Sequence, residues 1–223
     1  MKPYSVVDAL EEVVAEYAGS KYAVAVDSCT NAILLALKYT KMINDEWTDL
    51  DGEKMRRGPE LHFVDLPKKT YVGVAYAVLN AGLKCTFRDE NWSGAYNLGG
   101  TNIIDSARRF KKGMYVKNSL YCLSAHWGKH LRIGRGGFIL TDDFEAATIL
   151  KIMRFDGRTA GLPPKMDNFI YPGFHCYMLP EEAARGLMLM SYMPSDNLDI
   201  PWDDYADLSQ YPIFRDKWEM QGN

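Results

Sequence analysis

The stretch from Tyr22 to Tyr39, YAVAVDSCTNAILLALKY, contains the pattern that decides the fold. The apolar run Tyr22 to Val26 predicts a short buried strand. The run ends at Asp27 and Ser28, and apolar side chains then recur at helical spacing, which predicts a helix from Asn31 to Tyr39. A buried strand that passes through a polar turn into a helix is typical of α/β proteins.

The same alternation continues on both sides of this stretch. Further helices are predicted at Val6 to Tyr17, Tyr71 to Asn80, Phe144 to Phe155 and Pro180 to Met190, with Gly19 and Gly82 as the stops of the first two. Further strands are predicted at Leu61 to Leu66, Cys85 to Arg88, Asn102 to Ile104, Ser119 to Leu123 and Phe138 to Thr141. Residues 44–60 and 92–100 are predicted loops. This order predicts a three-layer sandwich with a mostly parallel central sheet.

We expect residues 1–193 to form one large domain and residues 194–223 a C-terminal arm. The arm is polar and acidic, but it also carries aromatic side chains, namely Trp202, Tyr205, Tyr211, Phe214 and Trp218. Such side chains favour an arm that packs on the body or on a partner.

Composition and charge exclude several classes of protein. The 223 residues include 47% hydrophobic residues and carry a net charge of -3, which argues against a disordered chain and against a nucleic-acid binder. No apolar run reaches the roughly 18 residues of a membrane span. No apolar signal segment follows Lys2, so we expect a cytoplasmic protein that does not bind membranes.

The spacing of cysteine and histidine gives no metal motif. The four cysteines, Cys29, Cys85, Cys122 and Cys176, lie far apart in the sequence, and we interpret them as reduced thiols. His126 and His130 have the spacing of a helical metal pair, but Gly128 lies between them and no third ligand is evident. We therefore expect no metal.

The residues that follow the predicted strands are candidates for a binding site, because ligands of such sheets bind at the carboxyl ends of the strands. Asp27 to Asn31 opens a helix and could bind an anion, although Ser28 or Thr30 could simply cap that helix. Asp105 follows a buried strand and needs a cationic or hydrogen-bonding partner. Lys129 follows another such strand and is either a solvated lysine or an activated amine.

Together these segments resemble the DegT/DnrJ/EryC1/StrS family of sugar aminotransferases, which are fold type I pyridoxal-phosphate enzymes. The segments occur in the order of the family pattern: Leu10 to Thr30, Thr70 to Gly82, Ile104-Asp105-Ser106-Ala107, Ser124 to Leu131 with the run-on Gly136-Gly137-Phe138, and Gly173 to Gly186. The resemblance covers most of Leu10 to Leu189. It implies that residues 1–193 are the large, cofactor-binding domain of that fold.

The resemblance also implies roles for individual residues. Lys129 would be the catalytic lysine that links covalently to the aldehyde of pyridoxal phosphate. Asp105 would pair with the pyridine nitrogen, and Tyr71 would stack on the ring. The phosphate would bind to the residues at the helix start and after one strand, namely Cys29, Thr30 and Ser124.

The chain differs from the family pattern at several points. Arg108 stands where members commonly have a glutamine that faces the phenolic oxygen of the cofactor, so we expect Arg108 to contact the cofactor. His175 stands where members have an asparagine that reaches the phosphate of the neighbouring subunit, and histidine can still donate a hydrogen bond. A loop between Glu90 and Thr101 replaces a longer strand–helix stretch, and most of the family's small domain has no counterpart.

The function implied by the resemblance is transfer of an amino group from an amino acid, with glutamate as the expected donor, to a keto-sugar attached to a nucleotide. Such sites are completed across a two-fold axis, so we expect a homodimer. A pyridoxal-phosphate-dependent lyase or dehydratase acting on a similar substrate is the first alternative. Lys129 argues against it, because the dehydratase branch of the family lacks that lysine. The second alternative is a binding protein without catalytic activity on the same fold.

Overall fold

The computed structural model describes residues 4–45, 47–48, 54–55, 58–201 and 205–215. The helices are α1 (Ser5–Ala18), α2 (Cys29–Asn44), α3 (Val72–Asn80), α4 (Phe144–Met153) and α5 (Pro180–Met190). The strands are β1 (Tyr22–Val26), β2 (Trp47–Thr48), β3 (Lys54–Met55), β4 (Phe63–Pro67), β5 (Lys84–Arg88), β6 (Tyr96–Asn97), β7 (Ile103–Asp105), β8 (Leu120–Ser124) and β9 (Gly137–Thr141). Each predicted helix and strand is present, with bounds that differ by a few residues.

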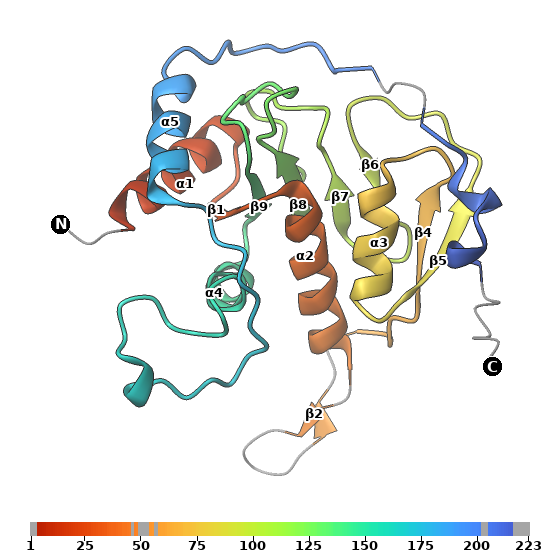
Figure 1. Ribbon diagram of the computed structural model, residues 1–223, viewed down its shortest axis with the longest axis horizontal. Coiled ribbons are helices and arrows are strands. Elements are labelled where there is room, and N and C mark those ends of the chain that lie inside the picture. Colours follow the sequence, from red (N-terminus) through yellow and green to blue (C-terminus); the bar gives the residue numbers. More distant parts are fainter. Residues whose placement is uncertain (1–3, 46, 49–53, 56–57, 202–204, 216–223) are drawn as a thin grey trace, which may run out of the picture.

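The central sheet has the strand order β1-β9-β8-β7-β6 (Figure 1). It is mixed, because only β7 and β8 pair in parallel, whereas β1–β9, β9–β8 and β6–β7 are antiparallel. The expectation of a mostly parallel sheet is therefore not confirmed at the level of strand pairs. Since β9 is antiparallel to both of its neighbours, β1, β8 and β7 nevertheless run in one direction, and their carboxyl ends lie at the same edge of the sheet.

The parallel pair β4–β5 continues this layer beyond β6. The N–H of Asp65 in β4 donates to the carbonyl of Gly99 at 3.1 Å, and the N–H of Gly99 donates to the carbonyl of Asp65 at 2.8 Å. Gly99 follows β6 directly. The start of α3, which follows β4, thereby reaches the same edge as the ends of β1, β7 and β8.

Helices cover both faces of the sheet, so the three-layer architecture is confirmed. Alternate residues of β1 show the two layers: Val24 and Val26 pack into the core beneath α2, α3 and α4, whereas Ala23 and Ala25 pack into the core beneath α1 and α5. This alternation follows from the period of two in a strand, and both faces are apolar because both are covered.

Local sequence signals explain where several helices begin and end. Ser28 caps α2, because its hydroxyl accepts a hydrogen bond from the N–H of Asn31 at 3.2 Å. Gly19 ends α1 with a φ of 83°, and Gly82 follows α3 with a φ of 78°, conformations that glycine adopts without a steric penalty. The predicted stops at these two glycines are confirmed.

Two predicted loops contain short strands. Within residues 44–60 the structure describes the antiparallel pair β2–β3, while residues 46, 49–53 and 56–57 lie outside the described residues. The 92–100 loop contains β6, where Tyr96 pairs with Asp105 of β7. This pairing is set by a distant partner strand, which local sequence cannot indicate.

The described part of the C-terminal arm packs on the body. It runs from the end of α5 across the carboxyl edge of the sheet to α3 and β5 (Figure 1). Asp199 pairs with Arg109 at 2.5 Å, and the N–H of Leu208 donates to the carbonyl of Lys68 at 2.8 Å. Leu208 and Phe214 are buried in the core beneath α2 and α3. Among the helices that the structure describes, none is long and apolar enough to cross a membrane.

Candidate active site

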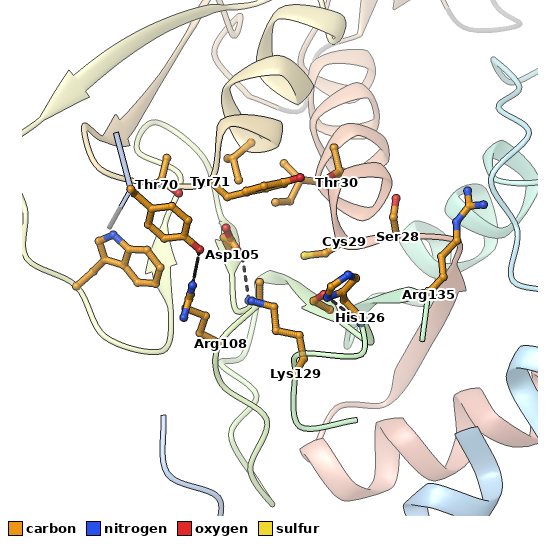
Figure 2. Close-up of a pocket in the computed structure, with 17 residues that line it drawn as sticks. Ser28, Cys29, Thr30, Thr70, Tyr71, Asp105, Arg108, His126, Lys129 and Arg135 are labelled. Atoms are coloured by element: carbon orange, nitrogen blue, oxygen red, sulfur yellow. Dashed lines mark hydrogen bonds between the residues drawn. The ribbon is translucent and has the colours of Figure 1, made fainter. Parts of the chain in front are cut away.

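A pocket of about 410 Å³ lies at the carboxyl edge of the sheet. Its lining includes Ser28, Cys29, Thr30, Tyr71, Asp105, Arg108, Ser124 and Lys129, which come from four separate segments of the chain (Figure 2). The structure thus brings together in one pocket every residue that the sequence predicts as a site residue, except His175.

One end of the pocket is the start of α2, and we call Ser28, Cys29, Thr30 and Ser124 the cup. The first backbone N–H groups of a helix lack intrahelical partners and favour negative charge. The backbone of β9 lies directly against the cup: a Cβ on Gly137 would lie 2.6 Å from the backbone nitrogen of Cys29. A glycine is therefore required where β9 meets the turn between β1 and α2.

Thr30 and Tyr71 are held close together across the pocket. A Cβ on Gly73 in the first turn of α3 would lie 2.6 Å from the Tyr71 ring and 3.0 Å from the Thr30 hydroxyl. The absence of a side chain at Gly73 gives the ring its place beside α2. The Tyr71 side chain is 55% exposed, so its ring is part of the pocket wall and not of the core.

Asp105 lies at the end of β7 and is 5% exposed. Its carboxylate accepts hydrogen bonds from the N–H of Ala107 at 2.9 Å and from the hydroxyl of Tyr96 at 2.9 Å. Tyr96 in turn shares a hydrogen bond of 2.6 Å with the hydroxyl of Thr70. Burial raises the pKa of Asp105, while these donors and the charges of Lys129 and Arg108 act in the opposite direction.

Lys129 lies in the loop between β8 and β9, and its side chain extends into the pocket toward Asp105 (Figure 2). The loop is fixed by backbone hydrogen bonds, among them one from the N–H of Lys129 to the carbonyl of His126 at 2.9 Å. The ammonium charge of Lys129 partly offsets the rise in the pKa of Asp105, so the two side chains interact electrostatically. An amine beside a buried carboxylate, in a pocket with an anion-binding end, can hold a carbonyl compound and exchange protons with it.

Arg108 lines the pocket at the end away from the cup, and it is 6% exposed. Its Nε and Nη2 donate to the hydroxyl of Tyr205 at 3.0 and 2.8 Å, and its Nη1 donates to the carbonyl of Pro201. Tyr205 belongs to the C-terminal arm and lines the pocket too. The structure therefore places Arg108 between the pocket and the arm, and its contact with a cofactor stays a prediction.

His175 does not line the pocket. Its Nδ1 lies 3.0 Å from the carboxylate of Asp156, and its side chain is 71% exposed. The sequence predicts that it acts on a neighbouring subunit, and that prediction stays open within a single chain. His126 lines the pocket, but the described residues contain no group of three side chains that could hold a metal. All four cysteines are free thiols.

The lining residues that the sequence did not predict include Trp92, Arg135 and Tyr205. Trp92 and Tyr205 stack with their ring planes 16° apart, although more than a hundred positions separate them in the sequence. Arg135 could have been found, because it directly precedes the glycine pair Gly136-Gly137 in a recognised segment. Nothing in the local sequence indicates the position of Tyr205.

The sheet, its two helix layers and the pocket at the carboxyl edge have the α/β architecture of fold type I pyridoxal-phosphate enzymes. Residues 1–93 match the model of the DegT/DnrJ/EryC1/StrS aminotransferase family, and the resemblance predicted from the sequence is thereby confirmed. A GDP-4-keto-6-deoxy-D-mannose 3-dehydratase from Yersinia pseudotuberculosis is 26% identical in an alignment of 234 positions, which covers 83% of this chain and 59% of that protein.

Solved structures of such enzymes have the same fold. A sugar aminotransferase from Micromonospora echinospora superposes with a TM-score of 0.66 at 15% identity, over 84% of this chain and 60% of that one. A candidate PLP-dependent aminotransferase from Bacillus cereus superposes with a TM-score of 0.65 at 16% identity, over 84% of this chain and 58% of that one. These relatives are pyridoxal-phosphate-dependent enzymes. The chain spans less than two thirds of their length.

Proposed function

We propose that this chain is a pyridoxal-phosphate-dependent aminotransferase that moves an amino group from an amino acid, with glutamate as the expected donor, to a keto-sugar attached to a nucleotide. The observation that carries the proposal is the joint presence of Lys129, Asp105 and the start of α2 in one pocket. These groups are an amine, a buried carboxylate and an anion-binding helix terminus. Pyridoxal phosphate offers an aldehyde, a basic ring nitrogen and a phosphate in return.

The size of the pocket and the order of its polar groups fit this cofactor. The pocket volume of about 410 Å³ is within the range of small-molecule sites. Gly73 lets the Tyr71 ring lie against α3, and Gly137 lets β9 lie against the cup, since a Cβ at either position would lie 2.6 Å from an atom of these groups. The donor set runs in the order that the cofactor requires, with the cup at one end and Lys129 and Asp105 further along (Figure 2).

The residues that would hold the cofactor follow from this order. The N–H groups at the start of α2 and the hydroxyls of Thr30 and Ser124 would bind the phosphate. Tyr71 would cover one face of the ring, and Asp105 would accept a hydrogen bond from the ring nitrogen. Bound pyridoxal phosphate supplies an electron sink, which stabilises negative charge at the carbon that loses a proton.

Asp105 is suited to its role by its surroundings. Burial disfavours its charge, so a cationic ring nitrogen beside it would be a strongly favoured partner. The hydroxyl of Tyr96 and the N–H of Ala107 fix the carboxylate in place through two hydrogen bonds of 2.9 Å. The carboxylate can therefore keep the ring nitrogen protonated without changing its own position.

Lys129 would carry the cofactor and would also move a proton. Its Nζ would take the proton from the Cα of the amino acid, because it is the basic amine that extends into the pocket (Figure 2). This lysine favours amino transfer over dehydration, as the resemblance to the two branches of the family implies. The similarity to a dehydratase keeps that reaction as the alternative.

The test is the absorption spectrum of the protein with pyridoxal phosphate, before and after glutamate is added. We expect a visible band that glutamate bleaches as the cofactor takes up the amino group. Lys129→Ala should still bind the cofactor through the cup and Asp105, but glutamate should not convert its cofactor to the amino form. A wild-type protein that binds the cofactor and does not respond to any amino acid would contradict amino transfer.

A further inference from the structure

Arg135 lies at the cup end of the pocket and has no role in the site described so far. It belongs to the loop between β8 and β9, directly before Gly136-Gly137, and it lines the pocket together with Ser28 and Gly136. Residue Gly136 forms a bridge with Ser28, so the backbone beside Arg135 is joined to the backbone of the cup. The position of Arg135 is therefore fixed relative to the start of α2.

The guanidinium is held beside the cup by Asp27. Its Nη2 donates to the carboxylate of Asp27 at 2.5 Å, and its Nε donates to the carbonyl of Asp27 at 3.3 Å. The same carboxylate accepts hydrogen bonds from the hydroxyl of Ser28 at 3.0 Å and from the side chain of Asn31 at 2.7 Å. Asp27 thus links the arginine to the residues that open α2.

The arginine and lysine side chains that line the pocket are spread along it. Arg108 lies at the far end against Tyr205, Lys129 lies in the middle near Asp105, and Arg135 lies at the cup (Figure 2). The cup itself offers only backbone N–H groups, hydroxyls and a thiol. A phosphate monoester brings a charge close to minus two, and the carboxylate of Asp27 would repel it.

We propose that Arg135 binds the phosphate of the cofactor and offsets the charge of Asp27. This assignment rests on the function proposed above. A guanidinium has five N–H donors in a planar fork. Within the described part of the chain, Nε and Nη2 of Arg135 donate to Asp27, which leaves Nη1 to donate to a phosphate oxygen. The side chain is 68% exposed, so the core does not enclose its guanidinium.

The assignment has a consequence for assembly. His175, the residue predicted to reach the phosphate from a neighbouring subunit, lies outside the pocket of its own chain. Arg135 is on the same chain as the cup, so part of the charge that holds the phosphate is present before any partner binds.

The experiment compares pyridoxal phosphate with pyridoxal, which lacks the phosphate, as ligands of the full chain. Dissociation constants are measured by quenching of tryptophan fluorescence for the wild type, Arg135→Gln, Arg135→Lys and a control, Arg132→Gln. Arg132 is in the same loop, is exposed and does not line the pocket. We expect Arg135→Gln to weaken the affinity for pyridoxal phosphate about tenfold and to change the affinity for pyridoxal by less than about twofold.

The lysine variant keeps the charge but loses the fork, so its affinity for pyridoxal phosphate should fall between those of the wild type and Arg135→Gln. Arg132→Gln should match the wild type with both ligands. Equal losses for both ligands in Arg135→Gln would show a structural role and overturn the assignment, as would unchanged affinities. If the wild type binds neither ligand, the proposed function fails as well, and that outcome is distinct from a wild type that binds both.

Discussion

At the scale of the residue, Asp105 decides how the site responds to pH. Burial raises its pKa, and the hydroxyl of Tyr96 and the N–H of Ala107 only partly counter that effect. Between the ordinary pKa of aspartate and the raised value, the folded protein holds a proton that the unfolded chain has released. The free energy of unfolding of the cofactor-free protein should therefore fall as pH rises through this window and then level off.

Asp105→Asn removes the titrating group, so its free energy of unfolding should lack this fall. Denaturant unfolding across a pH series, without cofactor, measures the difference between the two proteins. Asp196→Asn is the control, because that side chain is exposed and lies outside the pocket. Parallel pH profiles for the wild type and Asp105→Asn would contradict the raised pKa.

A single glycine also carries a prediction at this scale. A Cβ on Gly137 would lie 2.6 Å from the backbone nitrogen of Cys29 and 2.6 Å from the carbonyl carbon of Ser28, and backbone atoms cannot move aside cheaply. Gly137→Ala should lower the free energy of unfolding by about 1–3 kcal/mol and weaken binding at the cup.

The matched control is Gly128→Ala in the loop before β9, where the nearest atom to an added Cβ is a ring nitrogen of His126 at an ordinary 3.7 Å. Thermal or urea unfolding compares the two variants. If Gly137→Ala and Gly128→Ala have the same free energy of unfolding, that result would contradict the close approach of β9 to the cup.

At the scale of the element, the C-terminal arm contributes a wall of the pocket. Arg108 and Tyr205 connect the arm to the pocket. The Arg108 guanidinium donates two hydrogen bonds to the Tyr205 hydroxyl and lies 5.1 Å from the centre of the Tyr205 ring. Lys111 and Arg109 fix the arm further along through Asp199. The arm is therefore tied to the loop that follows Asp105, and removing that connection should loosen it.

A double-mutant cycle tests this connection. Arg108→Gln and Tyr205→Phe should each lower the free energy of unfolding. The double variant should lose less than the sum of the two single losses, and the difference is a coupling energy of about 0.5–3 kcal/mol. Tyr211→Phe, on the same arm but outside the pocket, should be additive with Arg108→Gln. Additive effects for Arg108 and Tyr205 would contradict the connection.

The strands and the arm show which parts of the site could be predicted from the sequence and which could not. Cys29, Asp105, Ser124 and Lys129 could be placed in one site because each follows a predicted strand, and strand ends meet at one edge. The direction of β9 could not be predicted, because a buried strand has the same apolar pattern whichever way it runs. Tyr205 could not be placed either, because its position depends on a contact with Arg108 that spans 97 positions.

At the scale of the whole molecule, we expect two chains to associate. Tyr71 and Trp127 lie at or beside the pocket and are 55% and 70% exposed, which leaves apolar surface for a partner to cover. Sedimentation equilibrium should show a homodimer, and Trp127→Ala should weaken it. Phe144→Ala is the control, since Phe144 is 69% exposed at the opposite end of β9. A stable monomer with cofactor bound would contradict the expectation.

The central claim is that Lys129 carries pyridoxal phosphate in this pocket. The most direct measurement is to incubate the protein with pyridoxal phosphate, reduce it with borohydride and locate the label by peptide mass spectrometry. We predict a pyridoxyl group on the peptide that contains Lys129, and none on that peptide in Lys129→Ala. A label on another lysine in place of Lys129, or no label at all, would contradict the account.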